Sequence, residues 1–254
     1  MNALFPAGAA LVVGGSGGVG QVIGETLARA GCDIVLTYRT NRATAEATAE
    51  RIRALGVNAT TFAYHADQDN AAAAMMQAAL TAHPRIHTVV NAAGSNIPMR
   101  FINALSPQEW ADIIHADFNG FFNLMHACLP HLREHGGSIV QISSIGIRRW
   151  PKQDVLSVAP KAGIEALVRG IAKEEGRHGV RANCVQLGVI DAGIFQRLKE
   201  TAFSPEWVEA ARNNTAVKRF GTPEDVAEAV LFLASSKAAY ITGESIRMDG
   251  GFSL

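Results

Sequence analysis

The chain has 254 residues, 48% of them hydrophobic, so it is long enough to bury the core of one large α/β domain. Lysine plus arginine and aspartate plus glutamate each total 23, which gives a formal net charge of zero. A balanced charge gives no support for nucleic acid or an anionic membrane surface as a general partner.

The three cysteines are Cys32, Cys128 and Cys184, and their wide spacing fits neither a CxxC pair nor a zinc site. We therefore expect no disulfide framework, and we expect a reducing cytoplasm as the location. The first ten residues lack the basic flank and apolar run of a signal peptide, and no stretch is long and apolar enough to cross a bilayer. The eight histidines show no metal-binding spacing, so no metal site is expected.

Apolar runs of strand length alternate with longer segments of helical period along the whole chain. The runs are mostly continuous rather than alternating, which indicates strands buried on both faces and hence a mainly parallel sheet. The predicted fold class is α/β: one doubly wound Rossmann domain over residues 1–254, with a seven-stranded sheet and helices on both faces. The predicted strands are residues 9–13, 33–38, 58–64, 86–91, 138–142, 181–186 and 245–248, and the predicted helices are about 18–30, 41–55, 68–82, 107–134, 155–177 and 223–234.

Residues 191–219 form the one long interruption of this alternation. Apolar side chains recur through the segment among polar ones, so it is amphipathic. We predict a mobile lid over a substrate site, the alternative being a plain surface insertion.

A glycine-rich turn, GGSGGVG at residues 14–20, follows the first predicted strand and opens the first predicted helix. Glycines allow a tight turn and a close approach to a pyrophosphate, which then faces the N–H groups at the start of the helix. The position after the first strand favours a dinucleotide site. The residues of the turn that we expect to contact the cofactor are Gly14, Ser16, Gly18, Val19 and Gly20.

The spacing of Gly14, Gly18 and Gly20, together with the Asn-Ala-Ala-Gly run at 91–94, resembles the short-chain dehydrogenase/reductase family. The resemblance extends over the whole chain, including RFGTPEDVA at 219–227 and DGG at 249–251, and is nearest to the 3-oxoacyl-carrier-protein reductase branch. It implies a nicotinamide cofactor whose binding residues include Asn91, Ala92 and Gly94. It also implies that Asp67 contacts the adenine and that the backbone of Ile190 meets the nicotinamide amide.

The end of the second predicted strand, TYRTN at 37–41, contains no acidic residue. An acid at this point would accept hydrogen bonds from the adenosine ribose and repel a 2′-phosphate. Arg39, next to Tyr38, can instead pair with the phosphate, with help from Arg42. We therefore predict that NADP(H) is preferred over NAD(H), the alternative being that Arg39 is an ordinary solvated arginine.

The resemblance implies a catalytic set in which a Ser holds the substrate oxygen, a Tyr transfers its proton, and a Lys lowers the pKa of the Tyr and binds the nicotinamide ribose. Ser144 and Lys161 match the Ser and the Lys, but the Tyr position is Ser157 and the position of a supporting Asn is Asp117. A serine hydroxyl is a much weaker acid than a phenol. One hypothesis is a water held by Ser157, Lys161 and Asp117 that carries the proton. The alternative is that Asp117 caps or bends its helix and that Lys161 only binds ribose.

Further departures from the family pattern, at Val13, Leu187 and Ala192, also fall around the expected reaction centre, whereas the scaffold motifs are kept. We interpret this as a remodelled site. The predicted function is an oxidoreductase that interconverts a carbonyl and an alcohol on a small molecule with NADP(H). The alternatives are a redox-neutral elimination or isomerisation using Ser144 and Asp117, a cofactor-binding scaffold or sensor, and a protein competent only beside another subunit.

The loop after Ser144 carries Arg148, Arg149, Trp150 and Lys152. These residues favour an acidic or aromatic substrate, although a solvated basic loop is an equal alternative. Reductases acting on carrier proteins often present arginines near the ends of the two long helices. Here the aligned positions are histidines, at 135 and 178, which weakens the carrier-protein interpretation.

The resemblance also implies a homotetramer or homodimer, assembled through the predicted helices near 107–134 and 155–177, with the tail at 252–254 at a second contact. Those helices carry more apolar residues than one helix face needs to pack against its own core. The residues concerned are Phe121, Phe122, Leu124, Ile164 and Leu167. The alternative is a monomer in which these residues face the sheet.

Overall fold

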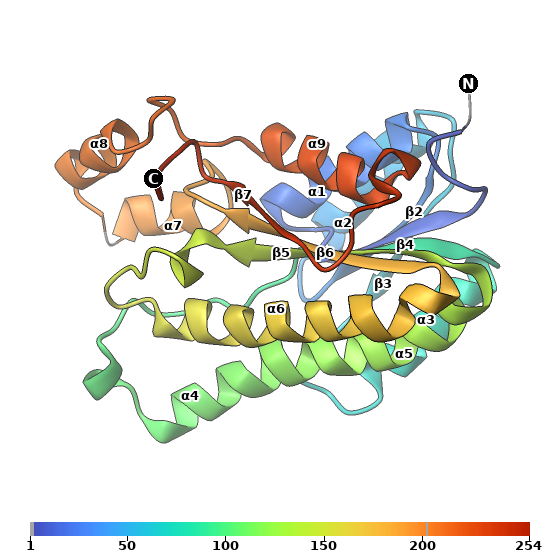
Figure 1. Cartoon of the computed structure of the whole chain (residues 1–254), viewed down its shortest axis with the longest axis horizontal. Helices are drawn as coiled ribbons and strands as arrows, with labels where there is room; N and C mark the ends of the chain where they lie inside the picture. Colours follow the sequence, from blue (N-terminus) through green and yellow to red (C-terminus); the bar gives the residue numbers. More distant parts are fainter. Residues whose placement is uncertain (1–2, 202) are drawn as a thin grey trace.

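The computed structural model describes residues 3–201 and 203–254, which form a seven-stranded sheet in which every neighbouring pair of strands is parallel (Figure 1). The order is β3-β2-β1-β4-β5-β6-β7, so the winding reverses between β1 and β4. In sheets of this kind, ligands bind beyond the carboxyl ends of the strands at that reversal. The strands are β1 (Ala9–Val13), β2 (Asp33–Tyr38), β3 (Ala59–Ala63), β4 (Ile86–Asn91), β5 (Gly137–Ser144), β6 (Val180–Leu187) and β7 (Ser245–Met248).

Helices cover both faces of the sheet, as its continuous apolar strands require. The helices are α1 (Gly18–Arg29), α2 (Arg42–Arg53), α3 (Ala71–Ala82), α4 (Pro107–Ile113), α5 (Gly120–His135), α6 (Val155–Glu175), α7 (Ile194–Thr201), α8 (Pro205–Asn213) and α9 (Pro223–Ala234). One core lies between the sheet and α3, α5 and α6, and includes Met75 and Phe121. The other lies under α1, α2 and α9, and includes Ile23, Leu27 and Val230. The predicted fold class and the seven predicted strands are confirmed.

The helix predicted over 107–134 is not one regular helix. It consists of α4, a π-helical segment at Ile114–Asn119, and α5. A π-bulge widens the helix by one residue per turn and is found frequently at functional sites. Asp117 lies inside the segment, and its side chain is hydrogen-bonded outside the helix, to Ser95. The periodicity of the sequence does not reveal such a bulge, because the apolar pattern continues through it.

Residues 191–219 contain two short helices, α7 and α8, which stand at one end of the molecule beside β5 and β7 (Figure 1). Four aromatic rings hold this segment together: Phe203 stacks on Trp207 at 3.8 Å between ring centroids, and Phe195 meets the edge of Phe220 at 4.9 Å. Ser204 caps α8 by accepting a hydrogen bond from the N–H of Trp207. The interruption predicted from sequence is therefore a folded unit, and its movement as a lid stays a prediction.

Three of the residues expected at a subunit contact lie instead in the chain's own core. Phe121, Leu124 and Ile164 are buried against the sheet, so this part of the expectation was wrong. Leu167 is partly buried against the same core. Phe122 points the other way: its side chain is 56% exposed and stacks on His126. Only the register of α5 on the sheet could separate Phe121 from Phe122.

The turn between β1 and α1 depends on glycine at two positions. Gly14 has φ +85°, which L side chains rarely adopt, and its N–H donates to the Thr37 hydroxyl at 3.1 Å. A Cβ on Gly20 would lie 2.2 Å from the carbonyl oxygen of Gly14, which is far inside van der Waals contact. A Cβ on Gly18, by contrast, would make only ordinary contacts at 3.5 Å, to Ala192 and Gly193.

We therefore expect Gly20→Ala to lower the free energy of unfolding by about 1–3 kcal/mol, because the turn must shift to admit the methyl group. Gly18→Ala is the matched control and should change it by no more than about 0.5 kcal/mol. Denaturant unfolding of the two cofactor-free variants measures both. Equal losses would contradict the close packing of this turn.

Candidate active site

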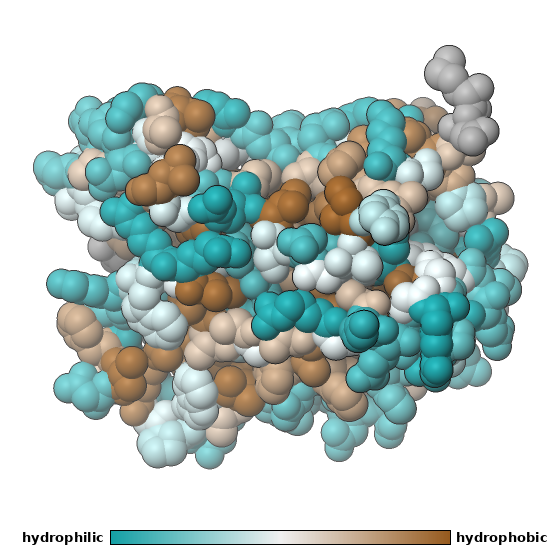
Figure 2. All heavy atoms as spheres, in the orientation of Figure 1, coloured by the Kyte–Doolittle hydropathy of each residue, from teal (hydrophilic) through white to brown (hydrophobic). Residues whose placement is uncertain are grey.

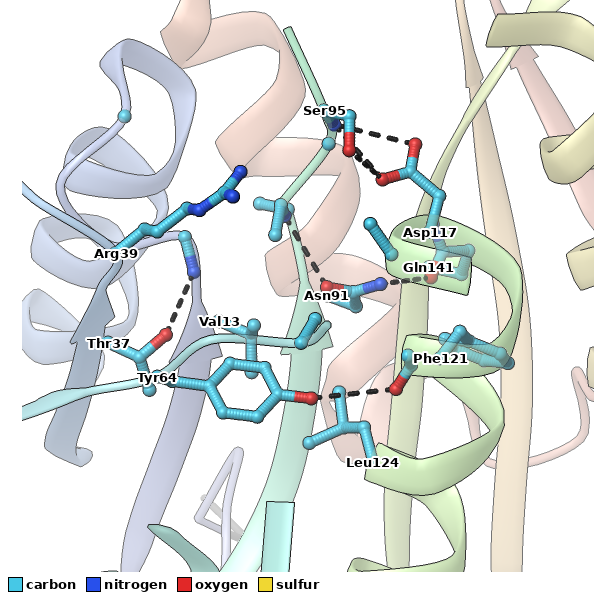
Figure 3. A pocket seen from close by; sticks show the side chains of 18 of the residues that line it. Val13, Thr37, Arg39, Tyr64, Asn91, Ser95, Asp117, Phe121, Leu124 and Gln141 are labelled. Atoms are coloured by element: carbon cyan, nitrogen blue, oxygen red, sulfur yellow. Dashed lines mark hydrogen bonds between the residues drawn. The ribbon is translucent and has the colours of Figure 1, made fainter. Parts of the chain in front are cut away.

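A cavity of about 260 Å³ lies beyond the carboxyl ends of β1, β2, β4 and β5, at the reversal of the winding (Figure 3). Of the predicted cofactor-binding residues, those lining it are Gly14, Ser16, Arg39, Asp67, Asn91, Ala92, Gly94 and Lys161. Asp117 also lines it, whereas Ser144, Ser157, Gly18, Val19, Gly20, Tyr38 and Ile190 are not part of its described lining. One cavity thus joins the glycine-rich turn, the end of β2 and the lysine of α6.

The floor of this cavity is held by polar side chains that the motifs alone did not indicate. Asn91, at the end of β4, donates to the Gln141 side chain of β5 at 2.9 Å (Figure 3). Gly14 is tied to β2 through Thr37, and Ala92 to β1 through the Val13 carbonyl at 2.9 Å. Parallel strands end at the same edge, so these contacts fix the three backbone segments around the opening.

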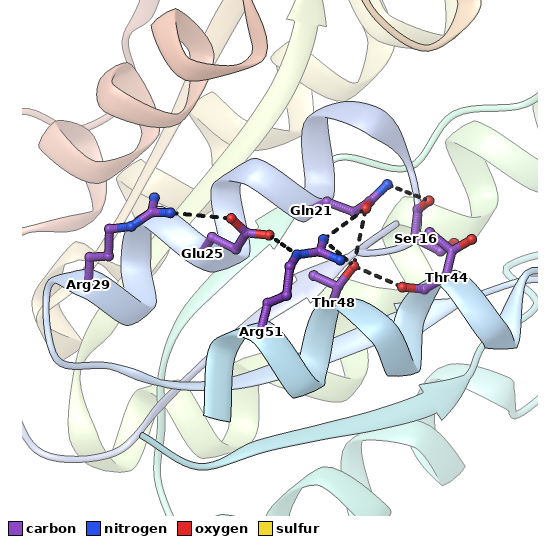
Figure 4. A network of polar contacts seen from close by, with 7 residues as sticks. All are labelled: Ser16, Gln21, Glu25, Arg29, Thr44, Thr48 and Arg51. Carbon is purple, nitrogen blue, oxygen red and sulfur yellow. Dashed lines mark hydrogen bonds and ion pairs between the residues drawn. The ribbon is translucent and has the colours of Figure 1, made fainter. Parts of the chain in front are cut away.

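A polar network joins the glycine-rich turn to α2, the helix that follows Arg39 (Figure 4). Gln21 of α1 donates to the Ser16 carbonyl at 3.3 Å and accepts from Thr48 and Arg51 of α2, each at 3.2 Å. Arg51 also pairs with Glu25 at 2.8 Å. This network therefore ties the turn and α1 to α2.

Arg39 and Asp67 form an ion pair at 3.1 Å at the mouth of the cavity. Arg39 leaves the end of β2 and points over the opening in Figure 3. Both side chains are substantially exposed, and exposed pairs of this kind contribute about 0–1 kcal/mol. A ligand phosphate can therefore displace Asp67 from the guanidinium at small cost.

Lys161 lies on α6 with its ammonium group at 3.1 Å from the Ser157 hydroxyl, to which it donates. Burial lowers the pKa of Lys161, and the carboxylates of Asp117 and Asp154 act in the opposite direction. The expected pairing of positions 157 and 161 on one helical turn is thus present, with a serine in place of a phenol.

Asp117 is held by Ser95, a residue that no motif singled out. The Ser95 hydroxyl donates to Oδ1 at 2.6 Å, and the Ser95 N–H donates to both carboxylate oxygens, at 3.1 and 3.4 Å (Figure 3). This bond crosses from the loop after β4 to the π-helical segment, which is the arrangement expected of a residue that bends its helix. The negative charge of the same carboxylate acts on Lys161 and raises the pKa of its ammonium group.

Ser144 ends β5, where its hydroxyl accepts a hydrogen bond from the Gly146 N–H at 3.0 Å. Behind it, the buried carboxylate of Glu165 accepts from the hydroxyls of Ser143 and Ser245 and from Gln186. This buried network joins β5, α6, β6 and β7, so the backbone that carries Ser144 is held to the neighbouring elements.

Two of the basic residues after Ser144 are used inside the chain. Arg148 donates to the Gln186 side chain at 2.8 Å, and Arg149 bonds the Phe252 carbonyl and lies 4.2 Å from the centre of its ring. Of the three basic residues expected to bind substrate on this loop, only Lys152 is therefore still considered for that role. Lys152 and Trp150 border a second hollow, of about 480 Å³, whose other lining residues are Phe101, Ile102, Asn103, Gln153 and Val155.

Figure 2 shows hydrophobic side chains gathered at the lower left of the molecule, over the segment before α4. Phe101, Ile102 and Trp150 are each more than half exposed. An exposed apolar cluster beside a cavity is a typical site for the apolar part of a small ligand.

No group of three or more potential metal ligands occurs within residues 3–201 and 203–254. Over the same residues, no helix is long and apolar enough to span a membrane. The three cysteines are free and buried.

The fold and the cavity define an α/β enzyme of the doubly wound class. The family described as "Enoyl-(Acyl carrier protein) reductase" matches residues 13–253. The chain is 34% identical over 247 residues to the 3-oxoacyl-(acyl-carrier-protein) reductase FabG of Staphylococcus aureus, covering 95% of this chain and 96% of that protein. It is 32% identical to the protein of that name from Chlamydia muridarum, covering 99% of each.

Among solved structures, a short-chain type dehydrogenase/reductase from Mycobacterium ulcerans superposes with a TM-score of 0.92 at 26% identity, covering 99% of this chain and 91% of that chain. The chain belongs to the short-chain dehydrogenase/reductase family and is an oxidoreductase of that family. The names of its relatives describe reductions of two different groups, an enoyl and a 3-oxoacyl group, so they define the family but not the substrate.

The interpretation that Asp117 bends its helix can be tested at its hydrogen-bond partner, Ser95. Ser95→Ala should lower the free energy of unfolding by about 1.5–3 kcal/mol, the usual contribution of a hydrogen bond to a charged group. Ser95→Thr, which keeps the hydroxyl, is the control and should recover most of the loss. Denaturant unfolding measures both. A loss below about 0.5 kcal/mol for Ser95→Ala would show that this contact does not hold the π-helical segment.

Proposed function

We propose that this protein is an NADP(H)-dependent oxidoreductase that interconverts a carbonyl and an alcohol on a small molecule. The observation that carries the proposal is the single cavity that joins the glycine-rich turn, Arg39 and Lys161. When bound, the reduced nicotinamide supplies a hydride to a carbonyl carbon. The chain's own residues have to hold the cofactor, place the substrate oxygen and provide a proton.

The residues present fit a dinucleotide. α1 begins at Gly18 without a side-chain cap from Gly17, so its first N–H groups are available to an anion. Arg39 is placed to exchange Asp67 for a 2′-phosphate, and Asp67 is then free for the adenine. Asn91, Ala92 and Gly94 would border the cofactor from the β4 side.

Lys161 would hold the nicotinamide ribose, and its positive charge favours negative charge on the reacting oxygen. Ser144 and Ser157 offer hydroxyl groups to that oxygen. The hollow lined by Phe101, Ile102 and Trp150 would receive an apolar or aromatic part of the substrate, and Lys152 would receive an acidic one. Closure of the lid at residues 191–219 would exclude water during hydride transfer.

Cofactor turnover tests the reaction class. Loss of NADPH absorbance in proportion to alcohol formed, with a panel of activated ketones, is the expected result. A protein that binds NADPH but never oxidises it would instead be a scaffold or sensor, and product without a change in NADPH would indicate a redox-neutral enzyme.

The cofactor preference is tested at Arg39. NADPH should bind more tightly than NADH by about 1.5–3 kcal/mol, and Arg39→Ala should remove this difference, because the charged hydrogen bonds to the 2′-phosphate are lost. Arg29→Ala is the control, since Arg29 is an exposed arginine that pairs with Glu25 on α1. Fluorescence titration gives the affinities for NADPH and for NADH of the parent protein and of each variant. Equal affinities of the parent protein for NADPH and NADH would refute the assignment.

We propose a reducing compartment such as the cytoplasm as the location, which the three free, buried cysteines support.

We also propose a homotetramer or homodimer assembled through α5 and α6. Phe122 supports this assembly, because it is a large apolar residue that lies exposed on α5, one of the two helices of the proposed contact.

Phe122→Glu should therefore reduce the mass in solution measured by light scattering, because a buried, unpaired carboxylate opposes association. Leu55→Glu is the control, since Leu55 is 44% exposed just beyond the end of α2. A mass near that of a single chain for the parent protein would contradict the assembly.

A further inference from the structure

Three polar residues lie at the N-cap and in the first turns of α6. Ser157 and Lys161 are four residues apart and lie on one face of the helix, whereas Asp154 is the N-cap residue, whose backbone angles of φ −112° and ψ 22° are not helical. The Asp154 carbonyl accepts the N–H groups of Ser157 and Val158 at 3.1 and 3.0 Å, so Asp154 stands directly at the start of the first turn. Lys161 donates to the Ser157 hydroxyl one turn further on.

Asp154 occupies the N-cap of α6 but makes no cap hydrogen bond with its side chain in the part of the chain that the structure describes. An aspartate at this position ordinarily accepts a backbone N–H of the first turn. Its carboxyl group is instead in an environment where burial raises the pKa to about 6, although the charge of Lys161 acts to lower it. A carboxyl group of this kind is available for proton transfer near neutral pH.

The backbone before Asp154 is strained. Gln153 has φ +67°, which is unusual for a residue with a side chain, and its carbonyl accepts the Arg100 N–H at 3.1 Å. Such conformations cost about 1–3 kcal/mol and cluster at active sites, where they aim a neighbouring group. Here the neighbour is Asp154.

Along the chain, Asp154 lies between residues that line two different hollows. Its neighbours Gln153 and Val155 line the hollow of Phe101 and Trp150, while Lys161, about two turns further along α6, lines the cavity of the glycine-rich turn. If a cofactor occupies the cavity and a substrate the hollow, the reacting carbonyl has to lie near the start of α6.

We propose that the carboxyl group of Asp154 is the proton donor for the substrate oxygen, in place of the phenol that the family resemblance leads one to expect at position 157. The assignment rests on the proposed function. As the hydride adds to the carbonyl carbon, the carbon–oxygen π pair moves to the oxygen. The O–H bond of Asp154 breaks and a new O–H bond forms on the substrate, giving the alcohol and the Asp154 carboxylate. Water then returns a proton to Asp154, and alcohol oxidation follows the same path in reverse.

Electrostatics supports this step. The neighbouring ammonium of Lys161 stabilises the carboxylate that the transfer leaves behind. Asp117 is the other charged group coupled to Lys161 among the described residues, and its carboxylate is occupied by Ser95. With a pKa of about 6, roughly one tenth of Asp154 is protonated at pH 7, whereas a serine hydroxyl is far too weak an acid to donate unaided.

The test compares Asp154→Asn with the parent protein, using NADPH and trifluoroacetophenone as an activated ketone. The expected loss in kcat is about 10²–10⁴-fold, the usual contribution of a general acid. The parent rate should fall as pH rises through about 6, because the protonated acid is lost, and this limb should vanish in the variant. Fluorescence titration should show unchanged NADPH affinity, and Asp112→Asn, on exposed α4, should leave rate and pH profile unchanged.

A second variant, Asp154→Asn with Ser157→Tyr, should recover at least about tenfold, because a phenol one turn from Lys161 regains a lowered pKa. An active Asp154→Asn protein with the parent pH profile would overturn the assignment while leaving the proposed function intact. A parent protein that oxidises no NADPH, while Ser157→Tyr alone becomes active, would show that the native chain holds no proton donor and would overturn both.

Discussion

Burial of the sheet on both faces is the constraint on which the rest of this structure depends. The strands are continuous apolar runs, and helices cover both of their faces, so the chemistry has to lie where the strands end. Because all neighbouring strands are parallel, the turn after β1, Arg39 after β2 and Asn91 at the end of β4 reach the same edge. The cavity is the space left where the winding reverses.

The site is further shaped by the residues that the helices bring to this edge of the sheet. The π-helical segment, tied to Ser95 through Asp117, brings one wall to the cavity, and the first turns of α6 bring Lys161 and Ser157. Glu165 holds α6 to β5, β6 and β7 through buried hydrogen bonds. A buried carboxylate is costly without such partners, so this network favours one position of α6 over others.

The elements of the fold and most of the cofactor side could be predicted from sequence, because they depend on local patterns. Apolar runs indicated the strands, and the glycine spacing indicated the turn at Gly14 and Gly20. Other features depend on contacts between distant segments. The pairing of Arg39 with Asp67 and of Ser95 with Asp117 joins residues more than twenty positions apart, and no periodicity or motif indicates which partners will meet.

The sequence by itself determined the fold class, the family and the presence of Ser157 four residues before Lys161, since each is a matter of residue type and spacing. Only the tertiary structure decided which apolar residues of α5 face the sheet, which arginines of the loop after Ser144 are already occupied, and that the charges of Asp154 and Lys161 act on one another. The physical reason is that burial and charge coupling depend on every segment around a group, and therefore exist only once the chain has folded.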